Sequence, residues 1–312
     1  MKRLNELLNI RYPLIQGGMA NIATGAFAAA CSNAGALGMI ATGGLDAEKL
    51  EEQIHIARSL TDKPFGVNMM LMMPDIDAMA EVAAREGVQI VTTGAGNPGK
   101  YMELWKSHGM TVIPVCASVL LAQRMVRIGA DAIIAEGTES GGHVGEMTTM
   151  ALVPQMADRI SIPVIAAGGI ADGRQLAAAY ALGACGAQIG TVLLASEECP
   201  IHENYKQALL ESSDNSTVVT GRSVNAPVRI LKNRMARMYL RRERAGATQE
   251  ELEQYTLGSL RKAVFDGNTQ EGSLMAGQVC GQLKEIQPLE KIFSRITEEA
   301  DAVMAGMCAA AV

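Results

Sequence analysis

A repeated alternation of short apolar runs and helix-like segments is the feature that most constrains the fold of this 312-residue chain. From residue 13 onward, each apolar run ends in a turn and is followed by a segment with helical apolar spacing, such as Ala47–Leu60, Ile76–Glu86 and Ser118–Ile128. Parallel strands need a crossover, which is usually a helix. The predicted strands are Leu14–Gln16, Leu37–Ile40, Phe65–Asn68, Ile90–Thr92, Thr111–Val115, Ala132–Ala135, Val164–Ala166 and Ala187–Ile189.

Eight such units fit before residue 200, and eight is the number of units that closes a barrel. We therefore predict an α/β fold in which residues 1–200 form a (β/α)8 TIM barrel that carries the cofactor site. The alternation of apolar runs and helix-like segments ends after Pro200. Polar turns, a basic helix and a glycine-rich stretch occupy residues 201–287. We predict a smaller C-terminal cap subdomain there, on the substrate side. Residues 288–312 are expected to form a helix that packs back on the barrel.

Charge and cysteine usage exclude several classes of function. The net charge of −6 argues against generic nucleic-acid binding. The six cysteines are scattered without metal-ligand spacing, which is typical of free thiols in a reducing compartment. Polar residues interrupt the N-terminal segment, so no signal peptide is expected, and the apolar stretch Ala302–Val312 is too short to span a bilayer. We expect a soluble cytoplasmic protein with no membrane partner, and the oligomeric state stays open, with a homodimer as one option.

A glycine-rich segment at Gly94–Gly99 matches the form of two nucleotide-binding motifs. It fits G-x-G-x-x-G, but no acidic residue follows about 20 residues later to hold a ribose. With Lys100 it nearly spells a P-loop, yet Tyr101 occupies the position of the Ser or Thr that should reach Mg²⁺. We interpret the segment as a barrel loop in which Pro98 starts a helix.

Two later glycine loops predict a phosphate site. In β/α barrels the loops after strands seven and eight often bind phosphate, because glycine lets backbone N–H groups approach the anion and a helix N-terminus adds a favourable dipole. Asp172-Gly173 leads into a helix just after the seventh strand. The ligand could be flavin mononucleotide (FMN) or a sugar phosphate. The candidate residues are Gly168, Gly169, Ile170, Gly190 and Thr191.

The ends of strands one and three predict contacts to a flat ring. Gly17, Gly18, Met19 and Ala20 follow the first strand, and backbone without bulky side chains can lie against a ring system. Asn68 ends the third strand and could hydrogen-bond a ring edge.

His143 is the main candidate for chemistry. It lies on a glycine-flanked loop beyond strand six, where an imidazole can transfer a proton near neutral pH. The same loop offers Glu136, Gly141 and Gly142 as further cofactor contacts. No Ser-His-Asp arrangement, metal cluster or activated cysteine is evident, so a bound redox cofactor is the natural source of chemistry. No role is predicted for His55, His108 or His202.

Two further segments have open interpretations. Met69, Met70, Met72 and Met73 follow strand three and could line an acyl channel or simply pack in the core. Residues 229–244 carry seven cationic side chains against Glu243 alone. This basic segment is either a solvated face or a docking site for an acidic carrier protein. Arg234, Arg237, Arg241 and Arg244 are expected on one helical face, and Leu231, Met235 and Met238 on the other.

Five strings carry a resemblance to a known family: TDKPFGVN, VTTGAGNP, AEGTESGGHVGEMTTM, IPVIAAGGIADG and GSLMAGQ. Together they resemble the class II, FMN-dependent enoyl-acyl-carrier-protein reductases, which are close relatives of the nitronate monooxygenases, once called 2-nitropropane dioxygenases. The resemblance runs from about Leu4 to about Gln287. The SGGH and AAGGI elements occur across the superfamily, whereas the fuller strings and GSLMAGQ resemble the reductase branch more.

The resemblance implies FMN, with its phosphate near Gly168, Gly169, Gly190 and Thr191 and its ring near Gly18, Met19, Ala20 and Asn68. It implies that His143 is catalytic. In a reductase, NADH or NADPH would reduce FMN, which would pass hydride to a trans-2-enoyl thioester on acyl-carrier protein. His143 would then protonate or stabilise the enolate. In a nitronate monooxygenase, the same histidine would act as base or orienting group while flavin and oxygen oxidise a nitronate.

We therefore expect an enoyl-acyl-carrier-protein reductase of bacterial fatty-acid elongation, with a nitronate monooxygenase as the alternative. Two other classes stay open on the residues alone. One is an isomerase or lyase that binds a sugar phosphate, and the other is a binding protein that retains the fold. The residues distinguish neither NADH from NADPH nor one acyl chain length from another, and they do not reveal a need for a monovalent cation.

Overall fold

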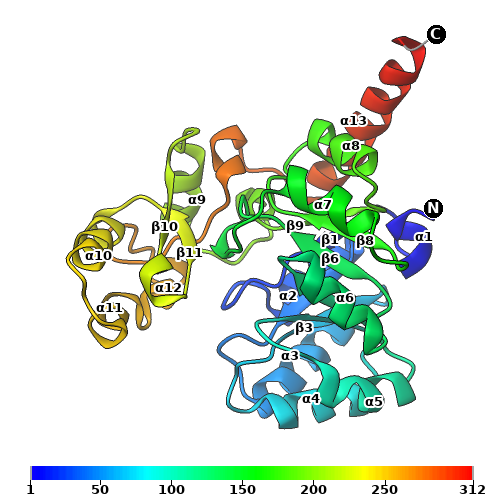
Figure 1. The fold of residues 1–312 in the computed structure, drawn as a ribbon, viewed down its shortest axis with the longest axis horizontal. Coiled ribbons are helices and arrows are strands. Elements are labelled where there is room, and N and C mark those ends of the chain that lie inside the picture. The colour runs from blue at the N-terminus through cyan, green and yellow to red at the C-terminus, as the bar shows by residue number, and fades with distance from the viewer. Residues whose placement is uncertain (1, 311–312) are drawn as a thin grey trace.

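Eight parallel strands form a barrel, as the alternation predicts (Figure 1). The computed structural model of the protein describes residues 2–310. The strands pair in the order β1-β9-β8-β6-β5-β4-β3-β2, and a bridge between Ile15 and Leu37 joins the ends of that order. The Gln16 amide donates to the Leu37 carbonyl at 2.9 Å across this junction. The barrel strands are β1 (Leu14–Gln16), β2 (Gly38–Ala41), β3 (Phe65–Met70), β4 (Ile90–Gly94), β5 (Thr111–Cys116), β6 (Ile133–Glu136), β8 (Val164–Ala167) and β9 (Ala187–Ile189).

Helices cover the outside of the barrel, and polar residues cap several of them. The Asp46 carboxylate accepts from the Lys49 amide at 2.9 Å, and the Ser118 hydroxyl accepts from the Leu121 amide at 3.3 Å. Such caps satisfy N–H groups that have no partner within the helix. Alongside the short α1 (Leu4–Leu8), the helices of this part of the chain are α2 (Gly25–Asn33), α3 (Ala47–Leu60), α4 (Ile76–Arg85), α5 (Gly99–Ser107), α6 (Val119–Arg127), α7 (Thr149–Ala157) and α8 (Gly173–Ala181).

The last helix of the chain completes this outer layer. After β9 the chain forms only the short 3-10 helix η1 (Thr191–Ala195) before it leaves for the cap. It returns as α13 (Leu289–Ala310), which contacts both α8 and α2. Helix α13 therefore takes the place of the helix that should follow the eighth strand, and its C-terminal part extends beyond the barrel (Figure 1).

Strand alternation divides the barrel interior into an apolar body and a polar end. Ile15, Met39, Ile113 and Ile134 belong to one buried apolar cluster. Successive side chains on a strand point to opposite faces, so Glu136 shares the inward face of β6 with Ile134. Polar side chains at the carboxyl ends of the strands therefore close the apolar interior and form the floor of any site above it.

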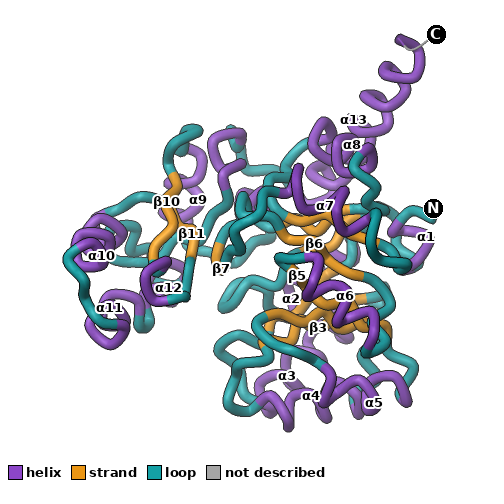
Figure 2. Tube along the Cα trace, in the orientation of Figure 1, coloured by secondary structure: helices purple, strands orange, loops and turns teal. Residues whose placement is uncertain are grey.

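The chain after β9 builds a small α/β cap beside the barrel mouth (Figure 2). Its sheet has the order β10-β11-β7, and both pairings are antiparallel. The third strand, β7 (Gly142–His143), comes from the loop after β6 and was not expected from the sequence. The other cap elements are α9 (Glu203–Leu210), β10 (Thr217–Thr220), η2 (Arg222–Val224), β11 (Val228–Leu231), α10 (Arg234–Arg244), α11 (Gln249–Thr256), α12 (Ser259–Val264) and η3 (Gln278–Gln282).

The apolar face expected for the basic helix is only partly right. Met235 is buried, but Met238 is 44% exposed, and Leu231 lies on β11 rather than on the helix. Tyr239 takes the buried position instead, next to Ala236. The four arginines expected on the opposite face are exposed.

The described residues contain no helix that is both long enough and apolar enough to cross a bilayer. The apolar stretch Ala302–Val312 is helical up to Ala310, and residues 311–312 lie outside the described part.

The packing of α13 can be tested with two phenylalanines. Phe293 on α13 is fully buried, whereas Phe265 is 50% exposed. Phe293→Ala should lower the free energy of unfolding by about 3–5 kcal/mol, because it leaves a cavity between the helix and the barrel. Phe265→Ala should lower it by less than about 1 kcal/mol. Urea unfolding followed by circular dichroism measures both, and equal losses would contradict this role for α13.

Candidate active site

One cavity of about 480 Å³ opens at the carboxyl ends of the barrel strands, where the cap meets the barrel. A cavity of this size suits a cofactor-sized ligand. It is lined by every residue for which the sequence predicts a cofactor contact or a catalytic role: Gly17, Gly18, Met19, Ala20, Asn68, Glu136, Gly141, Gly142, His143, Gly168, Gly169, Ile170, Gly190 and Thr191.

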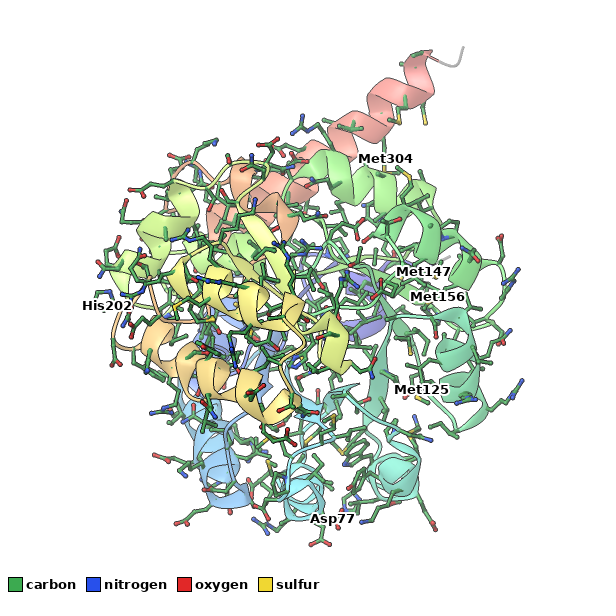
Figure 3. The ribbon with its side chains drawn as sticks, turned by 60° about the vertical axis from the view of Figure 1, so that its left-hand side comes forward. Asp77, Met125, Met147, Met156, His202 and Met304 are labelled. Atoms are coloured by element: carbon green, nitrogen blue, oxygen red, sulfur yellow. The ribbon has the colours of Figure 1, made fainter. Side chains whose placement is uncertain are left out.

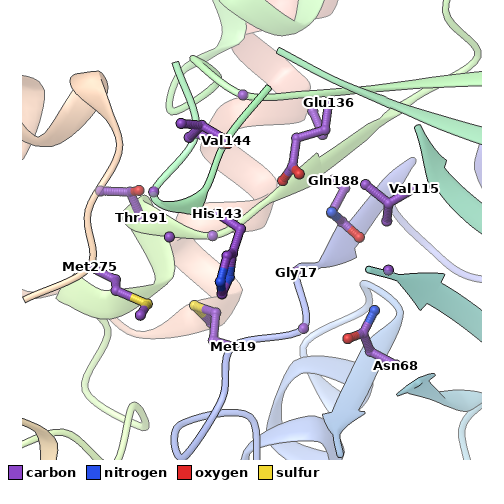
Figure 4. A pocket seen from close by; sticks show the side chains of 18 of the residues that line it. Gly17, Met19, Asn68, Val115, Glu136, His143, Val144, Gln188, Thr191 and Met275 are labelled. Carbon is purple, nitrogen blue, oxygen red and sulfur yellow. The ribbon is translucent and has the colours of Figure 1, made fainter. Parts of the chain in front are cut away.

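The floor of the cavity is polar (Figure 4). The Asn68 amide group donates to the Thr92 hydroxyl at 2.8 Å, which fixes its orientation. A Cβ atom on Gly18 would lie 2.4 Å from the Asn68 side chain, so only glycine allows this close approach. The buried Gln188 carbonyl Oε1 accepts no hydrogen bond within residues 2–310. The floor thus offers an acceptor for an N–H group of a bound ring.

Glu136 adds a titratable group to this floor. Burial raises the pKa of its carboxyl to about 7, while the nearby Ser140 hydroxyl acts in the opposite direction. The carboxyl forms no ion pair in the described part of the chain. Near neutral pH it therefore exists in both protonation states.

His143 faces the floor from the other side of the cavity. In the view of Figure 4, its ring projects into the open space between Met275 and Gln188. The His143 side chain is exposed to the open space of the cavity. The protein around it nevertheless removes part of its contact with bulk water, and this desolvation lowers the pKa of the imidazole. The imidazole is consequently neutral at pH 7, with one N–H donor and one acceptor nitrogen.

The loops after β8 and β9 have the backbone form that an anion site needs. Gly168 and Gly169 have φ values of +92° and +72°, which favour glycine. The amides of Gly168, Gly169 and Gly190 donate to no backbone acceptor among the described residues. Three N–H groups are therefore free to bind a phosphate.

The helix dipole expected at this site is not available from α8, and that part of the prediction is wrong. The Asp172 carboxylate accepts from the Arg174 amide at 2.9 Å, and the Glu299 carboxylate accepts from the Gly173 amide at 3.0 Å. Two carboxylates already occupy the N-terminus of α8, so a phosphate would depend on the glycine loops rather than on α8.

Only one of the four methionines after strand three reaches the cavity. Met70 lines it, whereas Met69 is buried in a separate core cluster and Met73 packs against that cluster. Met72 is 75% exposed. The acyl-channel interpretation is wrong for these three residues.

The glycine-rich segment Gly94–Gly99, which was interpreted as a barrel loop, forms such a loop between β4 and α5. Helix α5 starts directly after Pro98, and the Lys100 ammonium donates to the Asp77 carboxylate at 2.6 Å. The three other histidines lie outside the cavity lining. His55 pairs with Glu86 at 3.1 Å, and His202 caps α9 at the edge of the cap (Figure 3).

Several lining residues were not predicted from the sequence, among them Gln188 and three residues of the cap. Gln188 is the single polar residue of β9, and this polar position within an apolar strand could have indicated it. The cap contributes Leu260 from α12 and Met275 and Val279 from the segment 275–279, and only the fold brings these residues to the barrel mouth.

A model of the nitronate monooxygenase family matches residues 1–299 of the chain. The chain belongs to this family. It is a flavin-dependent oxidoreductase, and this class excludes the sugar-phosphate isomerase and the binding protein left open above.

Individual relatives point to more than one activity. The chain is similar to FabK from Thermotoga maritima, with a TM-score of 0.96 and 44% identity over 99% of each chain. It is 33% identical to a probable nitronate monooxygenase of Staphylococcus saprophyticus, over 88% of this chain and 91% of that one. It is 32% identical to the (3aS,4S,5R,7aS)-5-hydroxy-7a-methyl-1-oxo-octahydro-1H-indene-4-carboxyl-CoA dehydrogenase of Mycobacterium tuberculosis, over 95% of each.

The raised pKa of Glu136 predicts a pH-dependent stability. Between its ordinary value of 4.5 and about 7, the folded protein keeps a proton that the unfolded chain has released, so stability falls as pH rises through this window. In flavin-free protein at about pH 8, the free energy of unfolding measured with urea should be higher for Glu136→Gln than for wild type. The difference should reach up to about 2 kcal/mol, since the partial exposure of the carboxyl reduces the effect of its raised pKa. The two should differ little at about pH 4.5.

The exposed Glu103 on α5 provides the matched control. Glu103→Gln should follow the wild-type profile. If the stability of Glu136→Gln also parallels that of wild type from about pH 4.5 to pH 8, the pKa of the Glu136 carboxyl is not raised and the prediction is wrong.

Proposed function

We propose that this chain is an FMN-dependent enoyl-acyl-carrier-protein reductase that uses NADH or NADPH. The observation that carries the proposal is its 44% identity to FabK over 99% of both chains. The M. tuberculosis relative, by name, also acts on a carboxyl-CoA thioester. An enoyl thioester as substrate is compatible with both relatives.

We assign the cofactor contacts from the geometry of the cavity. The free amides at Gly168, Gly169 and Gly190, with Thr191, would hold the FMN phosphate. The backbone of Gly17 to Ala20 and the side chains of Asn68 and Gln188 would face the ring, and Glu136, Gly141, Gly142 and Ile170 complete its surroundings. Bound FMN would supply the hydride chemistry, taking a hydride from the nicotinamide and delivering it to the β-carbon of the enoyl thioester.

His143 is assigned the electrostatic part of the reaction. Its lowered pKa leaves a neutral imidazole, which can donate one N–H to the thioester oxygen as negative charge develops there. Met275 and Val279 of the cap add apolar lining to the same cavity. They would exclude water and contact the acyl chain, and this is the role that we assign to the cap over residues 201–287.

The same proposal implies a partner and a cellular compartment. The partner would be acyl-carrier protein or another acyl thioester. The working compartment would be the cytoplasm, because all six cysteines are free thiols.

One anaerobic experiment tests the proposal directly. The protein is reduced with NADH or NADPH, a short trans-2-enoyl thioester is added, and the flavin absorbance is followed. Rapid return of the oxidised band is expected. A reduced band that persists, together with bleaching of the oxidised protein by an alkyl nitronate, would instead support nitronate oxidation. The family match and the S. saprophyticus relative favour that second candidate.

His143 variants separate its role from cofactor reduction. His143→Ala should lower kcat for enoyl reduction by roughly 10²- to 10³-fold, because a donor to the developing oxyanion is lost. His143→Gln should retain more activity, since its amide N–H can replace the donor. The rate of flavin reduction by the nicotinamide should stay within about twofold in both. Stopped-flow spectroscopy measures the two half-reactions, and an equal loss in each would contradict the assignment.

The basic face of α10 predicts how a carrier protein binds. Its four arginines Arg234, Arg237, Arg241 and Arg244 form no ion pair within residues 2–310, in a chain whose net charge is −6. Arg237→Glu combined with Arg241→Glu should lower kcat/KM for a carrier-linked substrate by about tenfold or more at low salt, because an acidic carrier is then repelled.

The same substitutions should leave turnover of the corresponding coenzyme A thioester unchanged. Arg124→Glu with Arg127→Glu on barrel helix α6 is the charge-matched control, since both residues are exposed. Equal effects of the two pairs would remove α10 as the docking surface.

A further inference from the structure

The loop that carries His143 is held from the cap by one buried side chain, Arg229. This residue lies on β11 and is 7% exposed. Its Nε and Nη2 atoms donate to the Thr138 carbonyl at 3.1 and 2.9 Å, and Nη1 donates to the Thr217 hydroxyl at 3.1 Å. The guanidinium is therefore fixed at both edges, and it anchors the start of the loop between Glu136 and His143.

The backbone next to Arg229 holds the other end of the same loop. Arg229 is opposite Gly142 and Val228 is opposite His143 in the antiparallel pairing of β11 with β7. The Val144 amide donates to the Pro227 carbonyl at 3.2 Å just beyond this pairing. The short segment 227–229 thus holds both ends of the loop. The Arg229 side chain holds residue 138, and the backbone of the segment holds residues 142–144, so together they fix the separation of the two ends.

The barrel contributes a separate attachment on the opposite side. The Glu139 carboxylate accepts from the Thr149 amide at 3.0 Å and from the Thr149 hydroxyl at 2.9 Å. Glu139 therefore ties the middle of the loop to α7, while Arg229 ties its start to the cap. Because β7 has only two residues, its own pairing gives little rigidity.

Stability alone is a poor explanation for Arg229. The described residues place no carboxylate within ion-pair distance of it, and its acceptors are a carbonyl and a hydroxyl. Burial and the nearby Arg222 lower the pKa of Arg229, with Glu139 acting in the opposite direction. A buried charge without an ionic partner costs stability, so its presence at this loop indicates a positional role.

We propose that Arg229 is a positioning residue that fixes His143 over the cavity floor by holding Thr138 and the β7 strand at a set separation. The inference deepens the proposed function, on which its kinetic part rests. It also means that the cap and the barrel must keep their relative placement for the imidazole to face Gln188 and Asn68.

Arg229→Met keeps the volume of the side chain but removes all three hydrogen bonds. With a short enoyl coenzyme A thioester, kcat should fall roughly 10- to 100-fold while KM changes less than about threefold, because misplacement affects the reacting geometry more than binding. Arg229→Lys should recover part of the loss. Arg127→Met, at an exposed position on barrel helix α6, is the control and should match wild type.

Two further measurements distinguish positioning from general damage. In the double variant Arg229→Met, His143→Ala, kcat should equal that of His143→Ala alone, because Arg229 acts through the imidazole. The chain has four histidines, so His143→Ala identifies the His143 imidazole signals in a ¹H–¹⁵N spectrum. These signals should shift in Arg229→Met, while those of His55, His108 and His202 stay in place.

The spectrum does not depend on the reaction, so it remains informative if enoyl reduction is absent and the proposed function fails. Unchanged His143 signals, or additive losses in the double variant, would overturn the proposal. If Arg229→Met does not fold, Thr217→Val removes only the hydroxyl that accepts from Nη1. It should shift the same signals by a smaller amount, and unchanged signals there would likewise overturn the proposal.

Discussion

The parallel pairing of eight strands is the constraint on which the rest of the molecule depends. Because every barrel strand runs in the same direction, all the loops that follow them emerge at one end and meet around a single cavity. The bridge between Ile15 and Leu37 closes the circle, and the parallel pairing of β1 with β9 brings the loop after β1 next to the loop after β9. Residues as distant in sequence as Gly17 and Gly190 line the same space for this reason.

The same register determines the chemistry of the cavity. Inward-facing residues such as Ile15, Met39 and Ile134 are apolar, and polar side chains such as Asn68, Gln188 and Glu136 lie nearer the carboxyl ends of their strands. A carboxyl at that place has apolar side chains beneath it and the cavity above it, which accounts for a pKa of about 7. The imidazole of His143 meets the opposite boundary, where loop and cap reduce its contact with water. Burial thereby shifts the pKa values of the Glu136 carboxyl and the His143 imidazole, as is common for groups at functional sites.

Local sequence predicted the barrel well because its signals are local. Each strand has its own apolar run and each helix its own spacing or cap, so the eight barrel strands agree with prediction to within a few residues at their ends. The strand β7 could not be found in this way, because two residues carry no periodicity and their partners lie more than 80 positions later. Glu299 illustrates the same limit. It occupies the start of α8 from another helix, so the local pattern at Asp172-Gly173 overstated the dipole available to a phosphate. Candidate site residues were predictable where they end a strand, and the cap residues Leu260 and Met275 were not, since only folding brings them to the cavity.

The late position of α13 in the chain has a consequence for biosynthesis. Its buried residues Leu289, Phe293 and Ile296 cover a surface that α2 and α8 have already formed. While the chain is being synthesised, that surface stays uncovered until the whole cap has left the ribosome. A premature stop within the cap would therefore release a nearly complete barrel whose α2–α8 surface is uncovered, which is the kind of species that chaperones bind and that aggregates. The outer layer of the barrel is thus complete only once α13 has been synthesised.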